Sequence, residues 1–178
     1  MTDTVRVYCP VCQAEVERPA DLWTAAARTP RRLYRAVRGL TAADLAYRPR
    51  PDAWSLREVI LHLADTELVH GYRLRRALAE DSAELPAYDP AAWAVGAAYD
   101  RRDLRAAISA FRALRLANLD LLRSAGEAAF GRAGRHPRFG PLTVGQLFGH
   151  LVDHDRDHLR QLEWTRAVVE GKVDPGLS

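Results

Sequence analysis

Two histidines near the C-terminus, His154 and His158, are spaced one helical turn apart. Because each residue of an α-helix turns the chain by about 100°, side chains four positions apart lie on one face and can aim at one point. This spacing suits two ligands of a metal ion. A third imidazole, His62, lies in an apolar helical pattern where a core residue would be expected. Three histidine ligands with an open fourth position are more typical of a catalytic metal site than of a structural one.

Neighbouring side chains could support these three histidines. His150 lies one turn before His154, where it could line the pocket or serve as a substitute ligand. Asp65 could hold the second ring nitrogen of a ligand or line the pocket, although it could equally be an ordinary neighbour of His62 on the helix. Asp153, Asp155 and Asp157 could accept hydrogen bonds from ligand rings or simply face solvent. Imidazole ligands suit several divalent metals, of which we expect zinc or nickel.

The two cysteines of the chain form the sequence Cys9-Pro10-Val11-Cys12. In an intracellular chain, such a pair indicates metal or redox chemistry rather than a structural disulfide. Two thiolates cannot close a tetrahedral zinc site, so a second subunit or a histidine such as His70 or His136 would have to complete it. The thioredoxin-like interpretation lacks the surrounding βαβ pattern. A structural metal site, a redox pair and an inert remnant therefore remain open.

The elements that must position these side chains are helical. We expect four long helices, over residues 19–39, 55–79, 101–124 and 143–170. Two of them begin with a capping box, Ser55 with Glu58 and Thr143 with Gln146. Residues 80–100 form a long crossing loop, which indicates that consecutive helices need not be antiparallel neighbours. Residues 131–141 are expected to be a loop.

No sustained strand pattern is present in the rest of the chain, and the predicted fold is an all-α four-helix bundle. Residues 1–18 alternate weakly and predict an extended arm or short hairpin around the CxxC turn, followed by a bundle domain over residues 19–178. The length of 178 residues and the 48% hydrophobic content suit one well-filled core.

Composition also excludes several classes of partner. No apolar run approaches the roughly 20 residues that span a bilayer, and Met1-Thr2-Asp3-Thr4 does not begin a signal peptide, so we expect a cytoplasmic protein without a membrane partner. The net charge is +3, but the basic residues, of which only Lys172 is a lysine, are interspersed with Asp and Glu. This pattern favours solvated helix faces over nucleic-acid binding.

Several short motifs, taken in order, resemble a known family. They are WSLREV at 54–59, DTE at 65–67, FRALR at 111–115, GRHP at 134–137, and the stretch from 143 that ends in HDRDHLRQ at 154–161. Over about residues 20–170 the chain resembles the DinB-like superfamily, the YfiT-type metalloprotein bundles. The resemblance implies up-up-down-down topology, a homodimer, and a metal site with His62 on the second helix and His154 and His158 on the fourth. The Cys9/Cys12 arm departs from the usual pattern.

Relatives in this superfamily include thiol-dependent S-transferases and isomerases that use low-molecular-weight thiols such as bacillithiol or mycothiol. Our leading hypothesis is therefore a metal-dependent S-transferase, in which the open coordination position lowers the pKa of a small thiol and presents the thiolate to a small electrophilic substrate. One alternative is a metal-dependent hydrolase, with His150 or Asp65 as proton acceptor. Another is a non-catalytic metal-binding stress protein.

Overall fold

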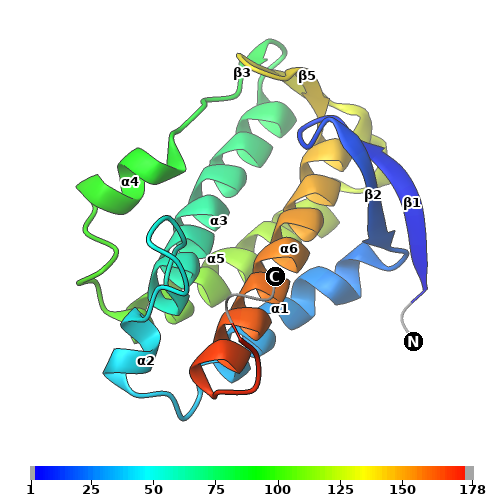
Figure 1. Ribbon diagram of the computed structural model, residues 1–178. Coiled ribbons are helices and arrows are strands. Elements are labelled where there is room, and N and C mark those ends of the chain that lie inside the picture. Colours follow the sequence, from blue (N-terminus) through cyan, green and yellow to red (C-terminus); the bar gives the residue numbers. More distant parts are fainter. Residues whose placement is uncertain (1–2, 175–178) are drawn as a thin grey trace.

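A bundle of four long helices forms the body of the molecule (Figure 1). The computed structural model describes residues 3–174, so that the outermost ends of the predicted arm and bundle domain, residues 1–2 and 175–178, lie outside the described residues. The four helices are α1 (Leu22–Val37), α3 (Leu56–Ala79), α5 (Leu104–Ala125) and α6 (Val144–Val169). Each lies within a few residues of its predicted range.

The starts of the helices follow from local hydrogen bonding. Both predicted capping boxes form: Ser55 with Glu58 begins α3, and Thr143 with Gln146 begins α6. Each box satisfies backbone N–H groups that have no partner within the first helical turn. Asp103 caps the start of α5 in the same way with its side chain. The two helices that carry the candidate histidines therefore have well-defined starts.

Each helix packs against two others, and the contacts fix its direction. α1 and α6 run parallel, because the Trp23 and Phe148 rings pack at 4.9 Å near their starts while Arg166 donates to the Arg35 carbonyl near their ends. α3 is antiparallel to α6, since His62 lies beside His154 and His70 beside His150.

The last pair, α3 and α5, runs parallel. Arg57 donates to the Arg102 carbonyl just before α5, and further along Arg115 pairs with Glu67. The four long helices therefore run up, down, down and up, and the predicted up-up-down-down order is wrong. The link over residues 38–55, which contains α2 (Ala42–Ala46), joins α1 and α3 at one end of the bundle. The link over 80–103, with α4 (Pro90–Gly96), runs the length of the bundle, as its length predicted (Figure 1).

Two small sheets accompany the bundle, and the all-α prediction is incomplete in this respect. β1 (Thr4–Cys9) and β2 (Ala14–Pro19) form the antiparallel hairpin expected of the arm, with Cys9 opposite Ala14. β3 (Ala83–Glu84), β4 (Ala133–His136) and β5 (Gly140–Thr143) form the second sheet, in which β4 is parallel to β3 and antiparallel to β5. The prediction of a loop over residues 131–141 is therefore wrong. The strands were not predicted because strands of four residues show no readable alternation of polar and apolar side chains. A 3-10 turn, η1 (Glu127–Gly131), precedes them.

The apolar core is divided into two clusters along α3. The first includes Leu56 to Ala64, and the second includes Leu74 and Ala77. Between them α3 buries polar side chains, among them Thr66, Glu67 and His70. The middle of the bundle is therefore a polar layer. Among the described residues, none of the helices combines the length and apolar character that a transmembrane span requires.

Candidate metal centre

The structure brings the three predicted histidines together. His62 projects from the first third of α3, and His154 and His158 project from α6. The Nε2 atom of His154 lies 3.1 Å from Nε2 of His62 and 3.2 Å from Nε2 of His158. All three ligand atoms lie within 4.8 Å of one another, so this cluster could hold a metal ion.

The spacing of the nitrogens fits a tetrahedral metal. A zinc ion binds imidazole nitrogen at about 2.0–2.1 Å, which places two nitrogens of a tetrahedral site about 3.3–3.4 Å apart. The two shortest separations here are close to that value. Nε2 of His154 has either one proton or one electron pair in the ring plane, so without a cation it could make a good hydrogen bond to only one of its two neighbouring ring nitrogens. One cation between the three rings would accept an electron pair from each.

A side chain from the next turn orients one of the ligands. Nδ1 of His158 lies 2.8 Å from Oε1 of Gln161. An amide oxygen only accepts, so Nδ1 carries the proton and the Nε2 electron pair is directed into the cluster. Sequence reasoning did not single out Gln161, although its position three residues after His158 was a readable signal.

Burial keeps the imidazoles neutral. It lowers the pKa of His62 to about 3, helped by His158, and holds the pKa of His154 well below its usual value. The pKa of His158 is lowered by the same cause. Neutral imidazoles offer electron pairs to a metal ion at neutral pH. His62 is buried, whereas His154 and His158 are half-buried.

Hydroxyl groups lie next to this cluster. Thr66 Oγ1 is 3.4 Å from Nε2 of His62 and 2.7 Å from the Tyr88 hydroxyl. Burial raises the pKa of Tyr88, so its phenol stays protonated. The Trp54 ring packs against His62 at 4.9 Å, and the Trp93 ring packs against Tyr88 at 4.8 Å. The cluster thus has hydroxyl groups and aromatic walls beside it, none of which the sequence analysis assigned to the site.

Asp65 has partners other than the histidines. Its carboxylate accepts a hydrogen bond of 2.6 Å from the Tyr99 hydroxyl and one of 3.2 Å from Arg102. Tyr99 and Arg102 lie at the end of the long link and just before α5. Asp65 therefore connects α3 to that link rather than orienting a ring of the cluster.

Two of the aspartates that alternate with the histidines are buried, so the interpretation of these two as solvent-facing is wrong. Asp153 is fully buried and pairs with Arg18 of the arm, with a shortest distance of 2.6 Å. Asp155 pairs with Arg115 at 2.6 Å and accepts from Thr29. Both carboxylates are paired with arginines from other elements and fix α6 to those elements.

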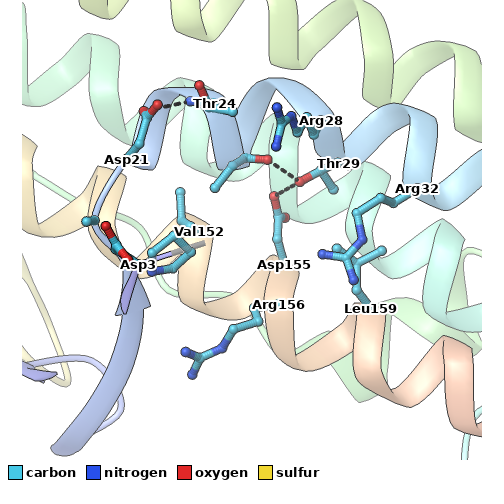
Figure 2. Close-up of a pocket in the computed structure, with 13 residues that line it drawn as sticks. Asp3, Asp21, Thr24, Arg28, Thr29, Arg32, Val152, Asp155, Arg156 and Leu159 are labelled. Carbon is cyan, nitrogen blue, oxygen red and sulfur yellow. Dashed lines mark hydrogen bonds between the residues drawn. The ribbon is translucent and has the colours of Figure 1, made fainter. Parts of the chain in front are cut away.

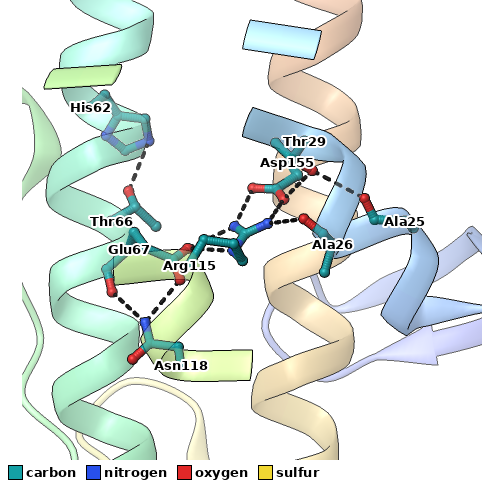
Figure 3. A network of polar contacts seen from close by, with 9 residues as sticks. All are labelled: Ala25, Ala26, Thr29, His62, Thr66, Glu67, Arg115, Asn118 and Asp155. Atoms are coloured by element: carbon teal, nitrogen blue, oxygen red, sulfur yellow. Dashed lines mark hydrogen bonds and ion pairs between the residues drawn. The ribbon is translucent and has the colours of Figure 1, made fainter. Parts of the chain in front are cut away.

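Arg115 is the centre of a buried network that joins all four helices (Figure 3). From α5 its guanidinium donates to Glu67 on α3, to Asp155 on α6 and to the Ala26 carbonyl on α1. Asn118 donates to the same Glu67 carboxylate. Asp155 and Glu67 are the sequence neighbours of His154 and Thr66, so the network fixes the two helix segments that carry the candidate centre.

The two cysteines lie beside His150. The Nδ1 atom of His150 is 3.6 Å from Sγ of Cys9 and 3.7 Å from Sγ of Cys12. The histidine beside the cysteines is therefore His150, and not His70 or His136, the two that the sequence analysis gave as examples. His70 packs against His150 with ring centres 5.6 Å apart, and His136 lies 3.2 Å from Arg73 instead.

The pKa of Cys12 is shifted in the direction opposite to that of a redox-active cysteine. Desolvation and the neighbouring Cys9 raise the pKa of Cys12 to about 12. Reactive cysteines of CxxC motifs have a lowered pKa, because the thiolate is the nucleophile.

A cavity of about 590 Å³ lies between α1, α6 and the arm (Figure 2). Arg28, Arg32 and Arg156 are among its lining residues, as is Asp155. At about 100° per residue, the α6 positions that line it are on the opposite side of that helix from His154. This cavity is therefore separate from the histidine cluster.

Several known proteins are similar to this chain. A protein from Oceanobacillus iheyensis with the name "Putative metal-dependent hydrolase OB0782" is 29% identical over 133 residues, which cover 75% of this chain and 77% of the relative. A protein of Halalkalibacterium halodurans, "Putative metal-dependent hydrolase BH0277", is 24% identical over 163 residues, covering 90% and 94% of the two chains.

A solved structure shares the fold. YfiT from Bacillus subtilis, described as a probable metal-dependent hydrolase with an unusual four-helix bundle topology, superimposes with a TM-score of 0.79. The sequence identity is 24%, and the match covers 85% of this chain and 87% of that one.

Residues 25–162 match the sequence model of the DinB superfamily. That range contains all three histidines of the cluster and most of the bundle, but neither cysteine. The match spans well over half of the chain, and the YfiT fold agrees with it. This protein belongs to the DinB superfamily, with a fold of the YfiT type.

Proposed function

We propose that this protein is a metal-dependent hydrolase of small electrophilic substrates such as esters or amides, and that His62, His154 and His158 hold its metal ion. The observation that carries the proposal is the convergence of three neutral Nε2 atoms at a spacing that suits a tetrahedral metal. His154 and His158 are only partly buried, which is compatible with substrate reaching the cluster from their side. The names of the relatives, which speak of metal-dependent hydrolysis, support this choice.

The residues around the cluster would have separate roles in binding the cation and the substrate. A divalent cation held by three imidazoles acts as a Lewis acid and lowers the pKa of a coordinated water. Gln161 keeps the His158 ring in the orientation that binds the cation. Tyr88 stays protonated and, next to Thr66, could donate a hydrogen bond to a substrate oxygen. Trp54 and Trp93 flank these groups with aromatic surface and favour a small substrate with an apolar part.

Thiol-dependent S-transfer is the second candidate. The cluster contains three imidazoles and no carboxylate among the described residues. A divalent cation lowers the pKa of a thiol that coordinates it, so the thiol releases its proton to solvent without a separate strong base. The names of the relatives do not point to this reaction, and for that reason we place it after hydrolysis.

One assay distinguishes hydrolysis from thiol-dependent S-transfer. Metal-free protein is reconstituted with zinc or nickel and tested on a panel of chromogenic esters, amides and phosphodiesters, with and without low-molecular-weight thiols such as bacillithiol or mycothiol. Turnover that needs metal but no thiol supports the hydrolase. Turnover only with a thiol supports the transferase.

The control variants are His154→Ala, which should abolish turnover, and His136→Gln, which leaves the cluster intact and should retain it. Turnover that His154→Ala leaves unchanged would contradict both reactions. Metal binding without turnover on any substrate would favour the non-catalytic metal-binding protein.

A further inference from the structure

A second group of metal-ligating side chains lies outside the histidine cluster, where the arm meets α6. We propose that Cys9, Cys12 and His150 form a second site for a thiophilic divalent cation such as zinc. The site does not depend on the proposed hydrolase activity. Its two cysteines also lie outside residues 25–162, the range that matches the family.

The distances between the three ligand atoms fit one tetrahedral ion. Zinc binds thiolate sulfur at about 2.3 Å and imidazole nitrogen at about 2.0–2.1 Å, which places sulfur and nitrogen about 3.5–3.6 Å apart in a tetrahedral site. The measured distances from His150 Nδ1 are 3.6 Å to Sγ of Cys9 and 3.7 Å to Sγ of Cys12. All three atoms lie within 4.8 Å of one another.

Both sulfur atoms approach the same ring nitrogen. A neutral imidazole nitrogen has either one proton or one electron pair in the ring plane, so it can make one good hydrogen bond and not two. A cation between the three atoms would satisfy the nitrogen and both sulfurs together. The backbone N–H of Cys12 also points to Sγ of Cys9 at 3.4 Å, and such a donor stabilises a thiolate.

Contacts between the arm and the bundle position these ligands. Cys9 ends β1 and is fully buried, and the tight turn that follows carries Gln13 at a φ of 55°. Arg18 on β2 pairs with the buried Asp153, three residues after His150 on α6. At Gly149 a Cβ atom would lie 2.3 Å from the Arg18 guanidinium, so a residue without a side chain lets the arm approach the helix. The hairpin is therefore held where its cysteines face His150.

The charges and the number of ligands indicate how the site would work. Two thiolates and a neutral imidazole balance a divalent cation, and the described residues supply three of four tetrahedral positions. The fourth position would take water or a small external ligand. Because His150 and His154 are one turn apart with ring centres at 6.0 Å, a cation bound here would clamp the arm to the helix that carries two of the three histidines of the first cluster.

Cobalt titration tests this site directly. Cobalt bound by thiolate gives a charge-transfer band in the near ultraviolet, and cobalt bound only by imidazole does not give this band. Reduced, metal-free protein should bind two equivalents of Co²⁺ and develop this band. Cys12→Ser is the informative variant, since Cys12 is exposed and its replacement spares the core. We expect it to lose the band and one equivalent of cobalt, while circular dichroism stays unchanged.

His154→Ala is the matched control, because it removes a ligand of the other cluster and should keep the thiolate band. Wild-type protein that binds cobalt without the band, or a Cys12→Ser variant that still binds two equivalents, would overturn the proposal. So would isolation of the protein with Cys9 and Cys12 joined in a disulfide that reduction does not convert to a metal-binding form. If only the three-histidine site fails to bind metal, the protein should still bind one equivalent of Co²⁺ and show the thiolate band. Failure of the proposed function can therefore be distinguished from failure of the cysteine site.

Discussion

At the scale of single residues, the candidate centre depends on which nitrogen of each imidazole faces the cluster. His158 shows how this is decided, because the Gln161 amide oxygen accepts from Nδ1 and leaves Nε2 for a metal. Partners of this kind raise the basicity of a ligand and fix its ring. Gln161 acts on the centre through His158 and is therefore a positioning residue.

Replacing Gln161 with methionine should weaken metal binding without unfolding the protein. Methionine has a similar volume but gives His158 no comparable acceptor, and loss of such a partner costs about 10–100-fold in metal affinity. Competition with a chromogenic chelator measures the change, preferably in a Cys12→Ser background that removes the second site. His70→Ala, which changes a histidine outside the cluster, should leave the affinity nearly constant. Equal affinity of Gln161→Met and the parent protein would contradict the role given to Gln161.

The buried histidines also make stability depend on pH. In the folded protein burial lowers the pKa of His62 to about 3, whereas an unfolded chain has the usual value of 6.5. Between these values the unfolded chain binds more protons, so the free energy of unfolding of metal-free protein should fall as the pH decreases below 6.5. The contribution is fully present above 6.5.

Urea denaturation measures this dependence at a pH above 6.5 and at one about two units lower. His62→Phe, which cannot titrate, should show a smaller difference between the two conditions. A parent protein whose stability does not change across this window would be inconsistent with buried neutral imidazoles.

The three histidines could be predicted from sequence because two share one helix face and the third interrupts an apolar helix. Two other features could not be predicted. The cysteines meet His150 only because the arm folds back on α6, and nothing local to Cys9 encodes a contact with a residue so distant in the chain. Asp155 looked like a solvent-facing member of a charged stretch, and its burial follows from Arg115, which comes from another helix.

At the scale of elements, the helices are joined by a polar layer between two apolar clusters. Arg115 is fully buried and has two carboxylate partners on two different helices. Because each of these carboxylates lies within one residue of a side chain at the candidate centre, the network holds α3 and α6 in register. Buried charges of this kind are costly to leave without a partner.

Replacing Arg115 with methionine should therefore destabilise the protein by about 3–5 kcal/mol, since Glu67 and Asp155 would remain buried together without a cation. Chemical denaturation measures the loss. Arg112→Met on the same helix is the control, because Arg112 is exposed and its replacement should change stability by less than about 0.5 kcal/mol. Similar small effects for both variants would show that the network contributes little.

The arm has its own attachment to the bundle. Arg18→Met should release the hairpin from α6, because Asp153 would lose the partner of its buried carboxylate. We expect faster amide hydrogen exchange over residues 4–19 in metal-free protein and a loss of up to about 3 kcal/mol, the low end for buried pairs, since Arg18 is partly exposed. Adding Asp153→Leu should recover part of the stability. Unchanged exchange in the hairpin would indicate that other contacts hold it.

The helices were predictable because their start signals are local, and the capping boxes of α3 and α6 place those starts to the residue. Their directions were not. The length of the 80–103 link indicated only that the helices on either side of it need not be antiparallel, whereas the incorrect up-up-down-down order was implied by the resemblance, in which α1 and α3 are parallel. The strands β4 and β5 are too short to give a periodic signal; they pair with each other, and β4 also pairs with β3.

At the scale of the whole molecule, the two apolar clusters should keep the bundle folded without a metal ion. In a Cys12→Ser background, chelation should lower the melting temperature while far-ultraviolet circular dichroism remains helical. At a free metal concentration about 1,000 times the dissociation constant, binding should add about 4 kcal/mol of stability. Unfolding upon chelation would instead make the ion a structural component.

The assembly of the protein stays a prediction. We expect a homodimer, and sedimentation velocity would distinguish it from the 19.9 kDa monomer. A single species at the monomer mass over the accessible concentration range would contradict that expectation.

The proposed function requires that three imidazoles from α3 and α6 share one metal ion. Anomalous diffraction from crystals grown with zinc, recorded on both sides of the zinc absorption edge, tests it most directly. We expect a peak about 2.0–2.1 Å from Nε2 of His62, His154 and His158. Well-ordered rings with no anomalous peak between them would contradict it.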